Sequence, residues 1–260
     1  AKKILFDSLS KNSYSIINSD DKRSDYITQN TKSKIVTYGL KNISDFNAKI
    51  VESTSESLTL NFEKVDVSFK IIGEFNAYNI LAVYSLANIL NIDKDLILKK
   101  LSELNTPNGR FEFLLGRNDK IGIVDYAHTP DALENILLNI LKFKKNKKLI
   151  TVVGAGGDRD KLKRPKMGKI ASDHSDFVFF TSDNPRNENE NDIISDILEG
   201  VSKDNYEVEI DRKKAIEKAF NRFNTNSIIL VAGKGHEKYQ IIGDKSLPHD
   251  DRQIIKKLIL

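Results

Sequence analysis

The segment Phe177-Val-Phe-Phe-Thr-Ser-Asp-Asn-Pro-Arg-Asn-Glu188 joins a short apolar run to a polar turn. An apolar run of β-forming residues bounded by turn residues is typical of a buried strand in a parallel sheet. Ligands of open α/β sheets bind in the crevice beyond the carboxyl ends of the strands. The turn that follows this strand contains Asp183, Asn184, Pro185 and Arg186. A carboxylate, an amide and a guanidinium beside a stiff proline suit a zwitterionic small molecule, and a helix-capping loop is the alternative interpretation.

The rest of the second half repeats this rhythm of strand and helix. Strands are predicted at residues 121–125, 149–153, 177–181, 206–210 and 228–232, and helices at residues 130–143, 164–172, 192–201 and 211–223. Regular alternation of this kind is typical of a doubly wound, mostly parallel sheet. The predicted fold class is therefore α/β.

The first half has a different pattern. Strands are predicted at residues 15–18 and 34–38, an antiparallel β-meander at residues 48–72, and helices at residues 76–90 and 94–104, with Asp93 capping the second helix. The turn cluster Thr106-Pro-Asn-Gly109 follows that helix and precedes the regular alternation of strands and helices. We therefore predict two domains, residues 1–107 and residues 108–260.

The composition excludes several classes of protein. The chain of 260 residues is 39% hydrophobic and 30% charged, as in ordinary globular proteins, and its lack of cysteine excludes disulfides and thiolate metal sites. No apolar run approaches the roughly 20 residues that span a bilayer, and the apolar run in residues 1–6 is too short for a signal peptide, so a cytoplasmic protein is expected. The net charge of +4 is modest and no basic patch is interleaved with aromatic residues. Neither nucleic acid nor a membrane is therefore an expected partner, and we expect a monomer that acts on small molecules.

Three more predicted strands end in polar turns. These turns are Asp125-Tyr-Ala-His-Thr-Pro130, Gly154-Ala-Gly-Gly-Asp-Arg-Asp160 and Gly233-Lys-Gly-His-Glu237. Together with residues 183–186, they can converge at one edge of one sheet. The glycine-rich turn is not the dinucleotide fingerprint, because the third glycine would fall on Arg159. The sequence also lacks the phosphate-loop, H-E-x-x-H and G-x-S-x-G motifs.

Six segments, taken in order, resemble the motifs of the Mur ligase family. They are Gly73-Glu-Phe-Asn-Ala-Tyr-Asn-Ile-Leu-Ala82, Asn108-Gly-Arg-Phe-Glu112, Asp125-Tyr-Ala-His-Thr-Pro-Asp131, Gly156-Gly-Asp-Arg-Asp-Lys161, Asp183-Asn-Pro-Arg186 and Gly233-Lys-Gly-His-Glu237. The resemblance implies that residues 1–107 are the last part of a P-loop-type central ATPase domain. It implies that residues 108–260 are the Rossmann-like domain that binds the incoming amino acid. The phosphate loop and the UDP-substrate domain are expected upstream of Ala1, and the fragment alone is expected to be inactive.

The resemblance implies an ATP-dependent ligase of peptidoglycan synthesis that uses Mg²⁺. Its expected substrates are ATP, meso-2,6-diaminopimelate and UDP-N-acetylmuramoyl-L-alanyl-D-glutamate. The glutamyl carboxylate is expected to form an acyl phosphate, which the diaminopimelate amine then attacks. The alternatives are an L-lysine-adding Mur ligase, a folylpolyglutamate-type ligase and a non-catalytic binding module. A nicotinamide dehydrogenase is disfavoured because the dinucleotide fingerprint fails.

The resemblance also assigns residues on the ATP side. Lys2 matches the family lysine that is carbamylated, which would convert a cation into an anionic oxygen ligand for Mg²⁺. Its neighbour Lys3 is the alternative. The other matches are Asn76 and Asn79 for the adenine side, Arg110 for a phosphate and Asp125 for the ribose.

On the amino-acid side, the positions that match diaminopimelate-binding residues are Arg159, Asp183, Asn184, Pro185, Arg186, Gly233 and Glu237. Diaminopimelate differs from lysine by a second carboxylate, which the guanidinium of Arg186 can bind bidentately. Lysine would leave Arg186 facing an ammonium group, so the resemblance and the charge both favour diaminopimelate. Glu237 can accept a hydrogen bond from an ammonium group. The residues before Arg186 in its turn are expected to shape that turn.

Overall fold

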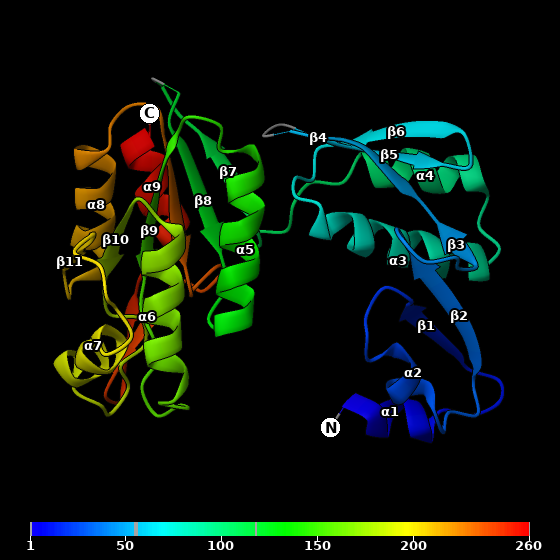
Figure 1. Ribbon diagram of the computed structural model, residues 1–260, viewed down its shortest axis with the longest axis horizontal. Helices are drawn as coiled ribbons and strands as arrows, with labels where there is room; N and C mark the ends of the chain where they lie inside the picture. The colour runs from blue at the N-terminus through cyan, green and yellow to red at the C-terminus, as the bar shows by residue number, and fades with distance from the viewer. Residues whose placement is uncertain (1, 55–56, 118, 260) are drawn as a thin grey trace. The chain divides into compact units, whose positions relative to one another are not determined.

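The computed structural model describes residues 2–54, 57–117 and 119–259. The chain divides into two compact units, Ala1–Asn105 and Thr106–Leu260, which are coloured blue to green and green to red in Figure 1. This division lies two residues before the boundary predicted after residue 107. None of the helices in the described residues is both long and apolar enough to cross a membrane.

The N-terminal unit contains two small sheets and four helices within the described residues. Its elements are α1 (Lys2–Ser8), β1 (Tyr14–Asn18), α2 (Ser24–Thr28), β2 (Lys34–Gly39), β3 (Phe46–Asn47), β4 (Lys49–Ser53), β5 (Leu58–Phe62), β6 (Val65–Phe69), α3 (Phe75–Ile89) and α4 (Lys94–Ser102). Strands β1, β2 and β3 form a parallel sheet in that order, and β4, β5 and β6 form an antiparallel one. The predicted meander is confirmed.

The core of the N-terminal unit lies between the meander and its two long helices. Leu58, Leu60 and Phe62 alternate along β5 and are fully buried together with Leu81 of α3. Asp93 caps α4 as predicted, because its side chain accepts a hydrogen bond from the backbone of Leu96. The two-residue strand β3 and the short helix α2 were not predicted, because neither is long enough to show a period.

The C-terminal unit has three layers, with one main sheet between two layers of helices. Its elements are β7 (Glu112–Leu115), β8 (Ile121–Asp125), α5 (Pro130–Phe143), β9 (Lys148–Val153), α6 (Lys163–His174), β10 (Phe177–Phe180), α7 (Glu190–Leu198), β11 (Tyr206–Val208), α8 (Arg212–Arg222), β12 (Ser227–Ala232), β13 (Tyr239–Ile242), β14 (Lys245–Pro248) and α9 (Asp251–Ile259). The main sheet has the order β11-β10-β9-β12-β8-β7, and all neighbours are parallel except β7 and β8. The predicted doubly wound, mostly parallel sheet is confirmed.

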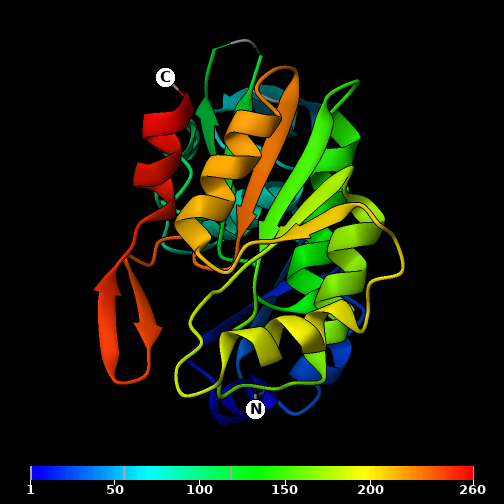
Figure 2. The same cartoon turned by 90° about the vertical axis from the view of Figure 1, so that its left-hand side faces the viewer.

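Helices cover both faces of this sheet (Figure 2). Val152 of β9 and Val231 of β12 pack in one cluster with Ile216 of α8 and Ile255 of α9. Alternate residues of a strand point to opposite faces, so the intervening residues face the layer in which α5, α6 and α7 pack side by side. Strand β12 follows α8 in the chain and lies between β9 and β8 in the sheet. The carboxyl ends of β8, β12, β9 and β10 therefore lie next to one another.

Several elements of the C-terminal unit differ from the sequence expectation. Helix α7 begins at Glu190 rather than residue 192, because Asn189 caps it by accepting from the backbone of Asn191. Strand β7, the hairpin β13–β14 and helix α9 were not predicted. The hairpin, drawn in orange-red in Figure 2, forms a two-stranded sheet of its own, joined to the turn before α7 by a bridge between Ile242 and Arg186, and β14 is exposed throughout. A strand without a buried face lacks the alternation by which strands are recognised.

Candidate functional site

A cavity of about 410 Å³ lies beyond the carboxyl ends of β8, β9, β10 and β12. Its lining residues are Tyr126, His128, Thr129, Gly156, Arg159, Asp160, Lys163, Asp183, Asn184, Arg186, Gly233 and Glu237. All of them except Lys163, the first residue of α6, come from the four turns that the sequence predicted to converge, and that convergence is confirmed. Pro185 lies in the same turn as Arg186 but is not among the lining residues.

The turns after β9 and β10 touch through their backbones. A Cβ atom on Gly157 would lie 1.9 Å from the carbonyl oxygen of Pro185, and one on Gly154 would lie 2.2 Å from that of Thr181. The Gly157 amide donates to the carbonyl oxygen of Asn184 at 2.9 Å. Glycine is therefore required here for close approach, and this contact places the two turns against each other.

The guanidinium of Arg186 is held along one edge. Its Nη1 donates to the carbonyl oxygens of Gly157 at 2.8 Å and Asn184 at 3.3 Å. The Nε and Nη2 groups have no hydrogen-bond partner among the described residues, and Arg186 lines the cavity. Since these two donors form one side of the planar fork, they can bind both oxygens of a carboxylate.

The hairpin β13–β14 holds the Asp183–Arg186 turn. The Arg186 amide donates to the carbonyl oxygen of Ile241 at 3.1 Å, and the Gly243 amide donates to the carbonyl oxygen of Arg186 at 2.7 Å. The Ile241 amide donates to Oδ1 of Asn184 at 2.9 Å. Arg186 has φ of 52°, a left-handed conformation that is rare for arginine, and these bonds hold it there. The hairpin that the sequence did not reveal is thus part of the site.

Asp183 carries a buried oxygen without a partner. The residue is 9% exposed, and its Oδ2 accepts no hydrogen bond within the described chain. Oδ2 would lie 2.6 Å from a Cβ atom on Gly233, which has φ of 115°. Buried carboxylates in proteins are normally paired, so Asp183 is suited to accept from a cationic group of a ligand. This differs from the expectation that Asp183 mainly shapes its turn.

Lys234 is a site residue that sequence reasoning missed. Its side chain is fully buried, and its Nζ donates to Oδ1 of Asn184 at 2.8 Å and to Oε2 of Glu237 at 3.2 Å. Nδ2 of Asn184 also donates to Oε2 of Glu237, at 3.0 Å. The only signal in the sequence was a lysine between two glycines, which gives no indication of burial.

The charges of the cavity lining are balanced. Three lining residues are acidic (Asp160, Asp183 and Glu237) and three are basic (Arg159, Lys163 and Arg186). Sequence reasoning also missed Lys163, whose Nζ donates to the carbonyl oxygen of His128 at 3.1 Å and whose pKa is lowered by burial. A balanced set of both signs fits a ligand that itself carries carboxylate and ammonium groups.

A network of ion pairs centred on the buried Arg164 supports the loops of the cavity. Both terminal nitrogens of Arg164 donate to Glu188 at 2.9 Å, and Nη1 also donates to Asp196 at 2.7 Å. Arg164 is fully buried and also donates to the carbonyl oxygen of Gly156 at 3.2 Å. The hydrogen bonds from Arg164 lower the pKa of Glu188 to about 2.

Replacing Glu188 with glutamine is expected to lower the free energy of unfolding at pH 7 by on the order of 2–3 kcal/mol. The folded-state pKa lies below the ordinary value of 4.5. The stabilisation is therefore complete above about pH 5 and is lost as the pH falls through about 2. Urea unfolding of parent and variant at a series of pH values measures it. The matched control is Glu199→Gln, at an exposed position, and an equal effect of the two changes at pH 7 would contradict the prediction.

The residues predicted on the ATP side have structural contacts of their own. The Arg110 guanidinium lies 4.5 Å from the ring centroid of Tyr126. Asp125 accepts from the backbone amides of Phe111 and Ala127, both at 2.7 Å, and burial raises the pKa of its carboxyl group. Through these hydrogen bonds, Asp125 links the end of β8 to the segment before β7, which is a structural role. Its role toward ribose stays a prediction.

The Asn76 and Asn79 pair lies on one face of α3, as their spacing predicts. Nδ2 of Asn79 donates to Oδ1 of Asn76 at 2.8 Å, and Nδ2 of Asn76 donates to the carbonyl oxygen of Ile72 at 2.8 Å. Asn76 is buried and Asn79 is exposed. A buried, hydrogen-bonded Asn76 orients Asn79 toward solvent, which is compatible with a ligand contact by Asn79.

Lys2 is exposed at the start of α1, whereas Lys3 forms an ion pair with Asp7 at 2.7 Å. No group of three or more His, Asp or Glu side chains in the described ranges could hold a metal ion. The residues described here therefore do not fit a Mg²⁺ site by themselves. A carbamate on Lys2 would supply one oxygen ligand, and its part in metal binding stays a prediction.

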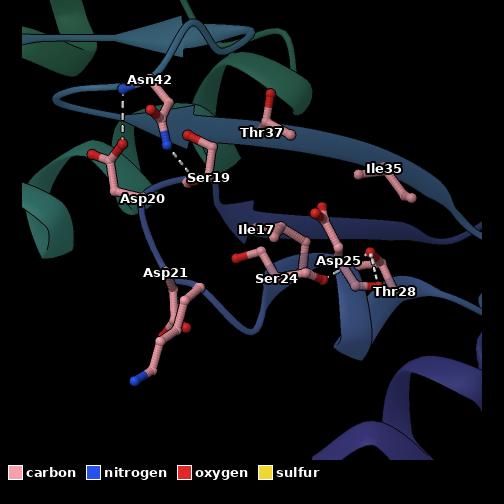
Figure 3. Close-up of a pocket in the computed structure, with 11 residues that line it drawn as sticks. Ile17, Ser19, Asp20, Asp21, Ser24, Asp25, Thr28, Ile35, Thr37 and Asn42 are labelled. Atoms are coloured by element: carbon pink, nitrogen blue, oxygen red, sulfur yellow. Dashed lines mark hydrogen bonds between the residues drawn. The ribbon is translucent and has the colours of Figure 1, made fainter.

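The N-terminal unit has a second cavity, of about 470 Å³, on the sheet of β1 and β2 (Figure 3). Ile17, Ile35 and Thr37 line it, and their neighbour Tyr38 packs into the core on the opposite face. Asp20 is engaged there by the backbone amides of residues 40–42 and by the hydroxyl of Tyr78, at 2.7–3.1 Å. The Asp20 carboxylate is therefore paired within the chain and does not by itself indicate a ligand.

The geometry defines a class of protein: a doubly wound α/β domain with a charge-balanced cavity at the carboxyl edge of its sheet. The family model "Mur ligase, glutamate ligase domain" matches residues 109–235, within this domain, and the model "Mur ligase middle domain" matches residues 1–87. The chain belongs to the Mur ligase family, and the resemblance seen in the sequence motifs is confirmed.

Named relatives are similar in sequence to this chain along nearly its whole length. A protein of Cytophaga hutchinsonii named UDP-N-acetylmuramoyl-L-alanyl-D-glutamate–2,6-diaminopimelate ligase is 47% identical over 262 residues, covering 100% of this chain and 54% of the relative. A Bacteroides fragilis protein of the same name is 45% identical, covering 99% of this chain and 54% of the relative. A solved structure with that title is 30% identical with a TM-score of 0.64, covering 99% of this chain and 55% of that one. The chain thus spans about half the length of the relatives it matches.

Proposed function

We propose that this chain is part of an ATP-dependent ligase that joins meso-2,6-diaminopimelate to the D-glutamate of UDP-N-acetylmuramoyl-L-alanyl-D-glutamate. The names of the relatives support the reaction. The cavity of the C-terminal unit is the proposed amino-acid site, with Arg159, Asp183, Asn184, Arg186, Gly233 and Glu237 around the ligand and Pro185 stiffening the turn.

One observation carries the choice of amino acid. Among the described residues, Arg186 has a guanidinium edge without a hydrogen-bond partner and Asp183 has a buried carboxylate oxygen without one, and both residues line the cavity. The far carbon of diaminopimelate carries a carboxylate and an ammonium group, which complement these two. The far carbon of lysine carries only the ammonium, so lysine would satisfy Asp183 and leave Arg186 unpaired.

The chain would contribute to the reaction by orienting the bound amino acid. When one end of the amino acid is fixed between Arg186 and Asp183, the amine at the other end is held in a defined position. Holding a nucleophile against an activated acyl group replaces an encounter in solution with an intramolecular step, which can supply much of the rate enhancement. Free oxygens such as Oε1 of Glu237 can accept from an ammonium group and so help select the pose.

We assign the nucleotide contacts by family resemblance alone. Asn79, supported by Asn76, is proposed for the adenine side, and Arg110 and Asp125 for the phosphate and ribose. ATP would supply the phosphoryl group that activates the substrate carboxylate. The residues described here suggest no further step for the nucleotide or for Mg²⁺.

Calorimetric titration of the chain with meso-2,6-diaminopimelate and with L-lysine tests the proposed substrate. Diaminopimelate is expected to bind at least about 10-fold more tightly, because lysine forfeits one bidentate, charge-assisted contact. An equal affinity, or a preference for lysine, would overturn the assignment of the substrate and leave the family membership untouched.

A further inference from the structure

Lys234 lies beneath the cavity and does not line it. Its side chain is fully buried between the turns after β10 and β12. A buried ammonium group is costly unless it is paired and hydrogen-bonded, and Lys234 meets this cost through Asn184 and Glu237. The protein therefore keeps a charge in a position where an apolar side chain would cost less, which points to a role other than stability.

The contacts of Lys234 determine how its two partners are oriented. Oδ1 of Asn184 accepts from Lys234 and from the amide of Ile241, so Nδ2 must point to Glu237. Oε2 of Glu237 accepts from both Asn184 and Lys234. Oε1 of Glu237 has no hydrogen-bond partner in the described part of the chain, and Glu237 lines the cavity. One carboxylate oxygen is thus anchored while the other remains available to a ligand.

We propose that Lys234 is a positioning residue, which orients Glu237 and Asn184 for recognition of an ammonium group of the bound amino acid. The proposal rests on the assignment of this cavity as the amino-acid site. Lys234 touches no ligand and acts through its two partners. Without Lys234, Oε2 of Glu237 would keep only its hydrogen bond from Asn184 and would lose its cationic partner, so the carboxylate would be held less firmly.

The backbone of the same turn supports this role. Gly233 and Gly235 flank Lys234 with φ of 115° and 54°, and the Glu237 amide donates to the carbonyl oxygen of Lys234 at 3.0 Å. This left-handed turn directs the lysine side chain inward, while Glu237, three residues later, returns to the cavity. A side chain at either glycine would strain this backbone and would also lie within 2.6 Å of Asp183 Oδ2 or of the Gly109 carbonyl oxygen.

The test is a double-variant cycle on the whole chain, with calorimetric affinity for meso-2,6-diaminopimelate as readout. Lys234→Met is expected to weaken binding about 20-fold, and Glu237→Gln by a similar factor. Because Lys234 acts through Glu237, adding Lys234→Met to Glu237→Gln should change affinity by less than about threefold. The control is Lys144→Met, which removes a lysine paired with Asp176 at the opposite edge of the sheet and should leave affinity unchanged.

Independent effects of the two changes, or full affinity in Lys234→Met, would overturn the proposal. If Lys234→Met does not fold, the proposal is still tested by comparing the affinity of the double variant with that of Glu237→Gln. The double variant is expected to fold because it contains no unpaired buried charge. A crystal structure of Lys234→Met provides a readout that needs no ligand. The Glu237 carboxylate is expected to leave its position in this variant, and an unmoved carboxylate would refute the inference. Failure of the parent to bind diaminopimelate would instead refute the proposed substrate.

Discussion

Arg186→Ala is expected to weaken binding of meso-2,6-diaminopimelate by about 100-fold, the effect of losing one charged, bidentate contact in a partly enclosed site. Nε and Nη2 of Arg186 have no hydrogen-bond partner among the described residues and form one planar pair of donors on a residue that lines the cavity. The change should cost only about 1–2 kcal/mol of stability, because it removes the two hydrogen bonds of Nη1. Affinity for L-lysine should hardly change.

Calorimetry with both amino acids, together with thermal unfolding, measures this outcome. Arg186→Lys keeps the charge but not the planar fork, and should recover only part of the affinity. Arg222→Ala is the matched control, because Arg222 stacks on Phe177 at the start of β10, far along the strand from the cavity. If Arg186→Ala binds diaminopimelate as tightly as the parent, Arg186 does not choose the substrate.

Arg212→Met is expected to destabilise the protein by about 3–5 kcal/mol, since it leaves a fully buried carboxylate without its main partner. Arg212 and Asp251 are both fully buried and form two hydrogen bonds, at 3.0 and 2.8 Å. Burial alone would raise the pKa of Asp251, but Arg212 and His249 hold it below its usual range. Arg212 also donates to the carbonyl oxygen of Ala232 at 2.9 Å, so the pair links α8, α9 and the end of β12.

Urea unfolding at pH 7 measures this loss. Replacing both partners in Arg212→Met/Asp251→Leu should restore most of the stability, because no charge then remains buried alone. Lys213→Ala, which removes an exposed ion pair with Glu217, is the control and should change stability by less than about 0.5 kcal/mol. A loss in Arg212→Met no larger than in this control would show that the buried pair contributes nothing.

The sequence revealed the central elements of the C-terminal unit because their local signals agree. Strand β8 and helix α5 have the predicted bounds, since the strand is a continuous apolar run and Thr129 and Pro130 mark the start of the helix. The same reasoning failed for β13, β14 and α9, whose positions depend on contacts with distant residues. The hydrogen bond between Arg186 and Ile241 joins positions 55 residues apart and leaves no local pattern.

The sequence by itself determined the alternation of strands and helices, the family and the four strand-end turns, because periodicity, turn residues and motif order are local properties. Only the tertiary structure decided how the side chains of those turns are used. It showed that, within the described residues, Asp183 has an oxygen without a partner and Arg186 has one guanidinium edge without a partner. It also showed that Lys234 is buried between Asn184 and Glu237. Burial and hydrogen-bond partners depend on residues that are far apart in the chain, and no local pattern of residues contains that information.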